Sequence, residues 1–511
     1  MLLGLLLVLN PVVTRPGYSI RLVSANVPAT VITQLAFKPG DLTHLYAVQE
    51  SGSVLRYDYN VLTGDLTNAA VLATGMAQAI GLAFHGNDAY VTIDRGGSRR
   101  IRPGDGRITR LSSPDGNGVF QVRHDFVHSI NKGDHDVNQL VILGNTLYVG
   151  IGAVTRNGDP SQENVYTMTL ARIADLTAID WSGPIGADFK GPLNYLSSPG
   201  EWVNSAPVDG YLRYYASGFR NPFGIAADDD GDLWVSTNGN SDAGFLSHDE
   251  LYRKVPLHGQ GTFPPASFGF PPPLIQGNPI LPFSDLGQNP SPTGLDFVPG
   301  GIDRGFVIQA QAGASDQVNF PVGKDVLRVD PVSGAFEILV DGMNLPTDVQ
   351  RDPYGRLLIA DYADGSIWLL TPPRDTVGAA SGLRVSKGAG GNLSLSWNPS
   401  CSAHDSDYEV YEGALGDLAS SVPRACSTGG ATSSTLPPSA GNRFYLVVPR
   451  DAWSEGSYGE KSGGTQRAQP PAACRPQVTG ACSISGQAGS GTGPEESATP
   501  STAVCLRATS T

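Results

Sequence analysis

The sequence predicts an all-β protein: a six-bladed β-propeller followed by a small β-sandwich. Three observations support this prediction. One hairpin pattern recurs six times before residue 372. Of the 511 residues, 63 are glycine and 39 are proline, more turn formers than a helical bundle tolerates. After a Pro/Gly/Ala-rich linker, a different set of alternating strands begins.

Each repeat is a short alternating apolar run, a Gly/Asp/Asn turn and a second alternating run. Period-two alternation marks strands, and the polar turn between two such runs marks a hairpin. The starts lie 46, 58, 85, 70 and 54 residues apart, which suits four-stranded units with loops of variable length. Six such units arranged radially form a propeller around a central channel. The repeats begin at Gln34, Ile80, Asn138, Phe223, Thr293 and Thr347.

The propeller is expected over residues 17–374 and the sandwich over residues 379–470. The second segment places Trp397 in an alternating strand, followed by tyrosine-rich strands, and it resembles a fibronectin type III module. Residues 471–511 are rich in Gly, Ser, Thr, Pro and Ala. They carry too little apolar surface to offset the entropy of ordering, so we expect a disordered tail.

The two ends of the chain indicate export. The first 13 residues, MLLGLLLVLNPVV, form the only strongly apolar run and are too short to span a membrane. We expect a signal segment at residues 1–16, no membrane span, and a secreted or periplasmic protein. The alternative is a buried N-terminal strand.

All five cysteines lie after residue 400, which suits disulfides in an oxidising compartment. We expect Cys401 to pair with Cys426 and Cys474 with Cys482, which leaves Cys505 alone.

Composition and missing motifs exclude several classes. With 34 basic against 48 acidic residues, the net charge is −14, which argues against a nucleic-acid partner. The sequence has no HExxH, GxSxG, GK[ST] loop or GxGxxG after a strand. A metalloprotease, α/β-hydrolase, nucleotidase or Rossmann dehydrogenase is therefore not expected. The Asp228–Asp232 run lacks the final glutamate of an EF-hand, so a hairpin turn is favoured over a calcium loop.

Two segments carry candidate chemistry. His135 opens the third repeat between Asp134 and Asp136, and an imidazole held by carboxylates is a natural general base near neutral pH. The alternative is a loop histidine hydrogen-bonded to its acidic neighbours. Arg220 and Asn221 precede the fourth repeat, where they could bind a planar or anionic ligand. The alternative is an ordinary surface turn.

Together, these segments resemble the soluble glucose/sorbosone dehydrogenase family, six-bladed propellers that bind pyrroloquinoline quinone and calcium. The resemblance extends from about Tyr18 to Leu370. It rests on His135 with the following LVILGNTLYVGIG, on Gly218-Phe219-Arg220-Asn221-Pro222, and on LWVSTNGN with Asp249-Glu250-Leu251.

The resemblance implies an oxidoreductase that oxidises an aldose at its anomeric carbon with hydride transfer to pyrroloquinoline quinone. His135 is implied as the general base, and Arg220 as a second catalytic residue that stabilises charge on the cofactor. The small-molecule partner is a sugar, and the electron acceptor is unknown. The implied contacts are Arg220, Asn221 and Lys324 for the cofactor, Gln78 and Asp136 for the substrate, and Gly239, Asn240 and Glu250 for Ca²⁺.

The main alternative is a noncatalytic extracellular propeller that binds a glycan or protein. Members of the family commonly place cations in the fifth and sixth blades to pair with the cofactor carboxylates. Here the fifth-blade QAGAS and sixth-blade DYADGS segments carry none, and Lys324 and Arg328 are the nearest substitutes. A propeller lyase or lactonase that uses a metal alone is a third reading.

Overall fold

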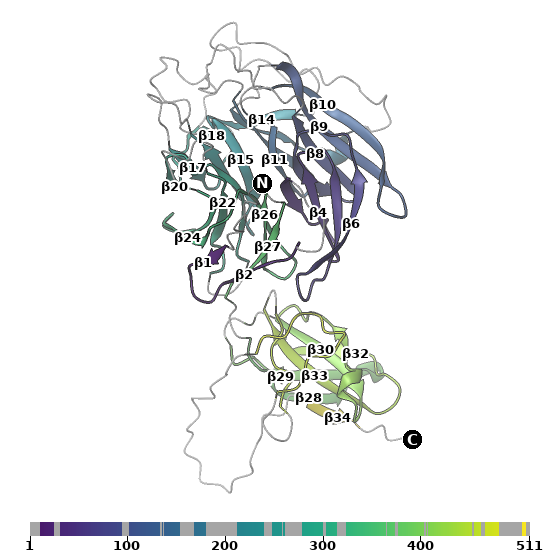
Figure 1. Cartoon of the computed structure of the whole chain (residues 1–511). Coiled ribbons are helices and arrows are strands. Elements are labelled where there is room, and N and C mark those ends of the chain that lie inside the picture. The colour runs from purple at the N-terminus through teal and green to yellow at the C-terminus, as the bar shows by residue number, and fades with distance from the viewer. Residues whose placement is uncertain are drawn as a thin grey trace, which may run out of the picture. The chain divides into compact units, whose positions relative to one another are not determined.

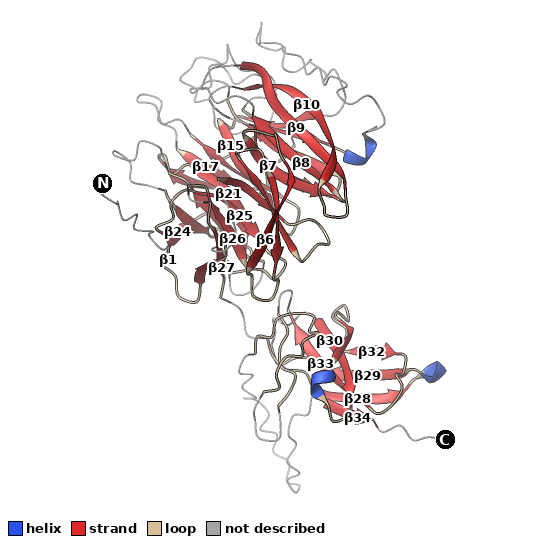
Figure 2. Cartoon of the chain, turned by 45° about the vertical axis from the view of Figure 1, so that its right-hand side comes forward, coloured by secondary structure: helices blue, strands red, loops and turns tan. Residues whose placement is uncertain are grey.

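The computed structural model describes residues 11–24, 31–94, 102–132, 135, 137–153, 168–179, 212–239, 248–257, 259–260, 278–299, 303–313, 323–363, 365–373, 377–402, 405, 407–451, 454–460, 466–479 and 503–506. Nearly all described elements are strands (Figure 2). The exceptions are short 3-10 helices at Leu176–Ala178, Ala389–Gly391 and Leu418–Ser420. No helix in these ranges has the length and apolar character needed to span a membrane. The chain divides into two compact units, one comprising Met1–Val298 with Arg304–Pro372 and the other Pro299–Asp303 with Pro373–Thr511.

The first unit is the predicted six-bladed propeller, and each blade is built on four antiparallel strands (Figure 1). Blade 1 is β3 (Ile32–Ala36), β4 (His44–Gln49), β5 (Val54–Tyr59) and β6 (Leu66–Ala73); blade 2 is β7 (Ala79–His85), β8 (Asp88–Asp94), β9 (Arg102–Pro114) and β10 (Phe120–Lys132). Blade 3 is β11 (Val137–Leu143), β12 (Thr146–Ile151), β13 (Thr169–Ile173) and β14 (Leu212–Ser217), extended by β18 (Gly259–Gln260) and β19 (Asn278–Pro279). Blade 4 is β15 (Asn221–Ala227), β16 (Leu233–Asn238), β17 (Asp249–Tyr252) and β20 (Ser284–Gly287); blade 5 is β21 (Pro292–Phe297), β22 (Val307–Gln311), β23 (Asp325–Val329) and β24 (Phe336–Asp341). Blade 6 is β25 (Pro346–Arg351), β26 (Leu357–Asp361), β27 (Ile367–Thr371) and the N-terminal β2 (Ser19–Leu22).

The start of the chain completes the propeller. Strand β2 is the outer strand of blade 6, where Ser19 pairs with Thr371. A second short strand, β1 (Val12–Val13), extends blade 5 by pairing with β24. Val12 is 62% exposed, so this part of the N-terminal segment is a strand but is not buried. Residues 1–10 lie outside the described residues, and the signal segment stays a prediction.

The blades pack face to face around the ring. Successive side chains of an innermost strand point to opposite faces, so Leu35 packs against blade 6 and Ala36 against blade 2. Each of the six blade interfaces has its own buried apolar cluster. The core of this unit is therefore a closed series of six clusters, which explains why every repeat needs the same alternating pattern.

A ring of polar contacts joins neighbouring blades, and its acceptor carbonyls all lie on innermost strands. In each case, a side chain of one blade donates a hydrogen bond to a backbone carbonyl of the next blade. The bonds run from Thr33 to Ala79 (3.0 Å), Thr92 to Asn138 (2.8 Å), Asn138 to Pro222 (3.0 Å), Ser236 to Thr293 (2.8 Å), Thr293 to Pro346 (2.9 Å) and Thr347 to Ile32 (2.8 Å). We call these six bonds the interblade ring.

Side chains also cross the channel between blades that are not neighbours. Gln34 of blade 1 donates to the Leu140 carbonyl of blade 3 at 3.2 Å. Gln139 of blade 3 donates to the Thr33 carbonyl of blade 1 and to the Asp348 carboxylate of blade 6. The three other blades have glycine at the equivalent position, Gly81, Gly224 and Gly294. At each glycine, the backbone or side chains of the next blade approach too closely for a Cβ atom.

The second unit is the predicted sandwich. One sheet contains β28 (Ser381–Lys387), β29 (Leu393–Asn398) and β32 (Ser433–Leu436). The other contains β30 (Asp407–Ala414), β31 (Val422–Ala425), β33 (Arg443–Arg450) and β34 (Ala503–Leu506). Both sheets contribute to one apolar cluster that includes Leu395, Trp397, Val410 and Val447. The resemblance to a fibronectin type III module stays a prediction.

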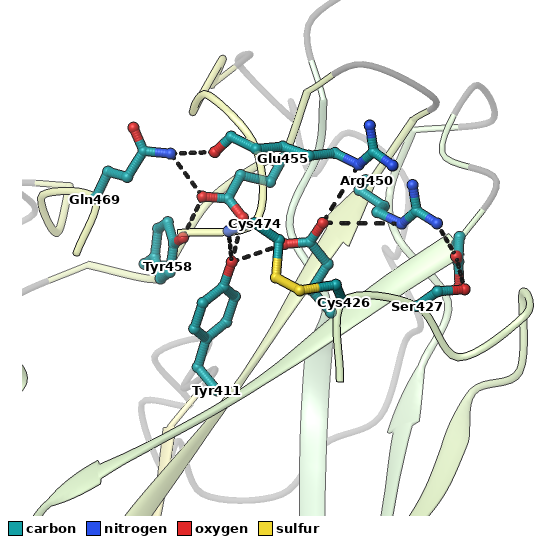
Figure 3. The surroundings of a disulfide bond; sticks show 11 residues. Tyr411, Cys426, Ser427, Arg450, Glu455, Tyr458, Gln469 and Cys474 are labelled. Carbon is teal, nitrogen blue, oxygen red and sulfur yellow. Dashed lines mark hydrogen bonds and ion pairs between the residues drawn. A yellow bond between two sulfur atoms is a disulfide. The ribbon is translucent and has the colours of Figure 1, made fainter. Parts of the chain in front are cut away.

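The predicted disulfide pairing is wrong. Cys426, directly after β31, is bonded to Cys474, with 5.7 Å between their Cα atoms (Figure 3). Cys401 is disulfide-bonded as well, although not to Cys426. The two predicted pairs are neighbours in sequence, whereas the folded chain brings Cys474 beside the β30–β31 sheet. The predicted start of the disordered tail, residue 471, is therefore too early in the sequence, since Cys474 is part of the folded unit.

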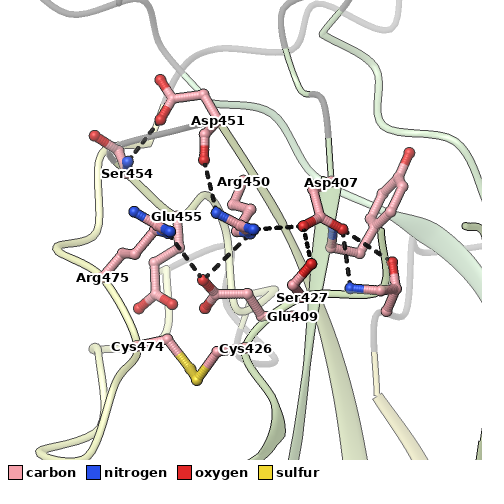
Figure 4. A network of polar contacts seen from close by, with 12 residues as sticks. Asp407, Glu409, Cys426, Ser427, Arg450, Asp451, Ser454, Glu455, Cys474 and Arg475 are labelled. Atoms are coloured by element: carbon pink, nitrogen blue, oxygen red, sulfur yellow. Dashed lines mark hydrogen bonds and ion pairs between the residues drawn. A yellow bond between two sulfur atoms is a disulfide. The ribbon is translucent and has the colours of Figure 1, made fainter. Parts of the chain in front are cut away.

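A polar network lies next to this disulfide. The Tyr411 hydroxyl lies 2.7 Å from the carboxyl of Glu409 and 2.6 Å from that of Glu455, and it accepts a hydrogen bond from the Cys474 N–H (Figure 3). Arg450 and Arg475 flank Glu409 (Figure 4). Burial, followed by the nearby Glu455, raises the pKa of Glu409 to about 9. The disulfide thus holds in place a segment whose Cys474 N–H donates to the Tyr411 hydroxyl and whose Arg475 pairs with the buried Glu409.

The close approach of blades 4 and 5 at Gly224 leads to a testable prediction. A Cβ atom on Gly224 would lie 1.9 Å from the Thr293 carbonyl oxygen, which is part of the interblade ring. We expect Gly224→Ala to reduce the free energy of unfolding, measured by urea titration, by about 2–3 kcal/mol. Gly116→Ala is the control because nothing lies within 4 Å of its Cβ position, and it should change stability by less than about 0.5 kcal/mol. Equal effects of the two substitutions would contradict this packing.

Candidate active site

His135 and Arg220 meet through the backbone that follows β12. The His135 N–H donates to the Ala153 carbonyl at 3.2 Å, and the Ala153 N–H donates to the Arg220 carbonyl at 2.8 Å. His135 lies two residues before β11, and Arg220 directly precedes β15, so both stand where an innermost strand begins. The structure therefore brings the two predicted catalytic residues to the same end of the channel. We call this end the site mouth.

Gly152 separates His135 from Asn221. A Cβ atom at this position would lie 2.4 Å from Cβ of His135 and 2.7 Å from Oδ1 of Asn221. Because both atoms are so near one point, they lie within about 5 Å of each other. The absence of a side chain at Gly152 lets the two residues approach, and the Nε2 atom of His135 is buried.

Asn221 belongs to a chain of three amides. Asn138 donates from Nδ2 to Oδ1 of Asn221 at 2.9 Å, and Asn221 donates from Nδ2 to Oδ1 of Asn238 at 3.1 Å. Asn138 is fully buried and also takes part in the interblade ring. Sequence reasoning missed Asn138 and Asn238 as site residues. The only signal in the sequence was position: Asn138 lies three residues after His135, and Asn238 belongs to the Asn238-Gly239 turn.

Arg220 is held by the loop that follows β16. It is 6% exposed and donates from Nη1 to the Gly239 carbonyl. The Gly239 N–H in turn donates to Asp249 at 2.6 Å, and Ser291 of blade 5 donates to the same carboxylate at 2.7 Å. Burial raises the pKa of Asp249 to about 7, although these hydrogen bonds and the charge of Arg220 oppose the shift. Asp249 is the acid that orders this loop, and we had singled out its neighbour Glu250.

The described residues do not assemble the predicted calcium site. The Gly239 carbonyl accepts a hydrogen bond from the Arg220 guanidinium. Glu250 lies on the opposite face of β17 from Asp249, where it accepts a hydrogen bond from Tyr252 at 2.6 Å. Asn240, the third predicted ligand, lies outside the described residues. Gly239 and Glu250 thus do not fit a shared Ca²⁺ ion, and we derive no step through one.

Two of the remaining predicted residues, Gln78 and Lys324, stand around the same mouth. Gln78 is three residues before Gly81, as Asn221 is three residues before Gly224, so the two occupy equivalent positions in blades 2 and 4. Lys324 directly precedes β23, and its N–H donates to the Gln311 carbonyl at the end of β22. Asp136 lies outside the described residues.

Arg328 is not available at the mouth. It lies further along β23, is 9% exposed, and pairs with Glu337 at 3.0 Å. Lys324 is then the blade-5 cation best placed for an anionic ligand among the residues that the structure describes.

Two other features are not part of the site. A cavity of about 270 Å³ lies at the other end of the channel, beyond Gln34 and Asp348, and no predicted site residue lines it. Asp228, Asp230 and Asp232 lie close together. However, Asp228 accepts hydrogen bonds from the backbone N–H groups of Asp230 and Asp232, as in the predicted hairpin turn.

Asp325, next to Lys324, makes folding stability depend on pH. It is 6% exposed, and burial, followed by the charge of Asp341, raises its pKa to about 7. The pKa of an unfolded aspartate is about 4. Between these values, the folded protein binds this proton more tightly than the unfolded chain does. The contribution of Asp325 to stability therefore falls as the pH rises from about 4 to about 7.

We expect Asp325→Asn to remove this part of the pH dependence. Urea unfolding at pH 4 and pH 8 should show that the variant loses less stability than the wild type, by up to about 4 kcal/mol. The exposed Asp230→Asn is the control and should leave the profile unchanged. Parallel profiles for wild type and Asp325→Asn would show that this carboxyl titrates normally.

The sequence matches no family model and no curated protein. Solved structures do match. The PQQ domain of pyranose dehydrogenase from Coprinopsis cinerea, in its holo form, is 15% identical, with a TM-score of 0.52 over 71% of this chain and 97% of that chain. The calcium structure of a Carbohydrate-Active Enzymes family AA12 protein from Trichoderma reesei is 17% identical, with a TM-score of 0.53 over 71% of this chain and 96% of that chain. The resemblance inferred from the motifs is thus confirmed for the fold: the chain shares the architecture of these two domains.

Proposed function

We propose that the protein is a sugar dehydrogenase that oxidises an aldose at the anomeric carbon and passes the hydride to pyrroloquinoline quinone. The observation that carries the proposal is the meeting of His135 with Arg220 and Asn221 around Gly152. His135 and Arg220 are 85 positions apart in sequence, and two backbone hydrogen bonds through Ala153 link them. The PQQ domain of pyranose dehydrogenase, which shares this fold, supports this choice of cofactor and substrate class, and the carbohydrate-active family AA12 protein supports the substrate class.

Each residue has a definite task in this proposal. Bound pyrroloquinoline quinone supplies the hydride acceptor, which no side chain can replace. The His135 imidazole takes the proton of the anomeric hydroxyl, because a neutral imidazole is an effective base near pH 7. Arg220 donates hydrogen bonds to anionic oxygens of the ligand, and its burial strengthens them. Asn221 uses one Nδ2 hydrogen for Asn238, so the other can bind the ligand.

Three further residues complete the proposal: Lys324 and Gln78 at the rim of the mouth, and Asp136. Lys324 would pair with a cofactor carboxylate, and Gln78 and Asp136 would bind sugar hydroxyls. We also propose export of the protein, in line with a signal segment at residues 1–16. Calcium is tested as a separate component, since Gly239 and Glu250 do not converge on one ion.

Cofactor titration with His135 variants tests the proposal. Purified protein is titrated with pyrroloquinoline quinone, with and without Ca²⁺, and aldose-dependent dye reduction is then measured. We expect a change in the quinone absorbance for the wild type. His135→Ala should bind the quinone within a few-fold of wild type and lose about 10²- to 10⁴-fold in kcat, as expected for loss of a general base. His85→Ala is the control and should keep full activity, because His85 is a half-buried histidine that is hydrogen-bonded to Asn145.

The same experiment addresses the noncatalytic alternative, which the sparse cations of blades 5 and 6 favour. Absence of any quinone-dependent absorbance or activity would reject the dehydrogenase. Glycan or protein binding that survives His135→Ala, together with that absence, would identify a binding propeller instead.

A further inference from the structure

We propose that Asn138 is a positioning residue: its amide sets the orientation of the Asn221 amide and thereby determines which group Asn221 presents to the cofactor. The inference rests on the proposed function, since it concerns the same mouth. It adds a residue that neither the motifs nor their resemblance assigned. A backbone carbonyl, which can only accept hydrogen bonds, sets the orientation of the Asn138 amide.

That carbonyl belongs to Pro222. Asn138 donates from Nδ2 to the Pro222 carbonyl at 3.0 Å and to Oδ1 of Asn221 at 2.9 Å. A carbonyl cannot donate, so Nδ2, and not Oδ1, of Asn138 must face Pro222. Asn221 must then turn its Oδ1 toward Asn138 and its Nδ2 toward Asn238 and the mouth. The donor-to-acceptor direction of the hydrogen bonds along the three amides thus follows from the Pro222 carbonyl.

The other end of the Asn138 amide supports this account. Its Oδ1 is buried and has no hydrogen-bond partner. An unpartnered buried acceptor is costly, and an apolar residue of similar size would avoid the cost. The presence of an amide at position 138 is therefore explained by the two hydrogen bonds that its Nδ2 donates. One of its two acceptors belongs to the interblade ring, and the other belongs to the site.

Gln309 provides a matched control in blade 5. It is fully buried as well, and its Nε2 donates to the backbone carbonyls of Thr293, Gly294 and Ala310. Its Oε1 is likewise buried with no hydrogen-bond partner. Gln309 thus has the structural features of Asn138 without a hydrogen bond to a site side chain. A purely structural role for Asn138 predicts that equivalent substitutions at the two positions behave alike.

Asn138→Asp and Gln309→Glu are the test pair, because each keeps the shape or length and removes the amide donors. With a carboxylate at position 138, Asn221 is expected to turn its Nδ2 toward it and present Oδ1 to the mouth. We expect the Kd for pyrroloquinoline quinone to rise about tenfold or more for Asn138→Asp and to stay within about twofold of wild type for Gln309→Glu. Both variants should lower the thermal midpoint, which is measured alongside as the structural readout.

The outcomes separate the two claims. Equal Kd values for Asn138→Asp and Gln309→Glu at similar thermal midpoints would overturn the positioning role and leave the proposed function intact. A wild type that binds no quinone would reject the proposed function and this role with it. If either charged variant does not fold, Asn138→Ala and Gln309→Ala replace the pair. The same tenfold difference in Kd is then expected, and its absence again overturns the role.

Discussion

The interblade ring is the constraint on which the rest of the propeller depends. Each of its six bonds joins a polar side chain of one blade to a backbone carbonyl of the next, and the last, from Thr347 to Ile32, returns to the first blade. Backbone carbonyls at the inner edge of a sheet would otherwise be left without partners in a crowded channel. Satisfying them from the neighbouring blade sets the spacing of the blades, and that spacing leaves room only for glycine at Gly81, Gly224 and Gly294.

The candidate site uses the same contacts. Asn138 donates one hydrogen bond to the ring and another to Asn221, so the position of blade 3 relative to blade 4 also determines the orientation of the site amide. Gly152 and Ala153 then bring His135 and Arg220 to this point. Because Gln34 and Gln139 cross the channel, the site mouth is separated from the cavity at the far end. Chemistry at the mouth is thus confined to one end of the propeller.

Much of the fold could be predicted because its signals are local. Alternation and turn residues repeat within each hairpin, so six blades could be counted without any knowledge of contacts. Closure by Ser19–Leu22 could not, since this short strand resembles no part of a repeat and its partner is more than 340 residues away. The disulfide prediction failed for a related reason. Cys426 and Cys474 are close only after β30 and the later segment have packed together.

Site residues could be predicted where a motif marks them, but not where a side chain acts by positioning another residue. His135, Arg220 and Asn221 are brought together, and Gln78 and Lys324 stand around the same mouth. Asp249 was quoted only as a neighbour of Glu250, because strand alternation alone does not say which face meets the Gly239 loop. Asn138 looks like an ordinary strand residue until its two acceptors are known.

A crystal structure of the protein with pyrroloquinoline quinone would test the central claim most directly. The account predicts cofactor density at the site mouth, with anionic oxygens against Arg220, a hydrogen bond from Nδ2 of Asn221, and the His135 imidazole beside the face of the ring system where the sugar would bind. Cofactor density at the other end of the channel, or at the site mouth but away from His135, would contradict it.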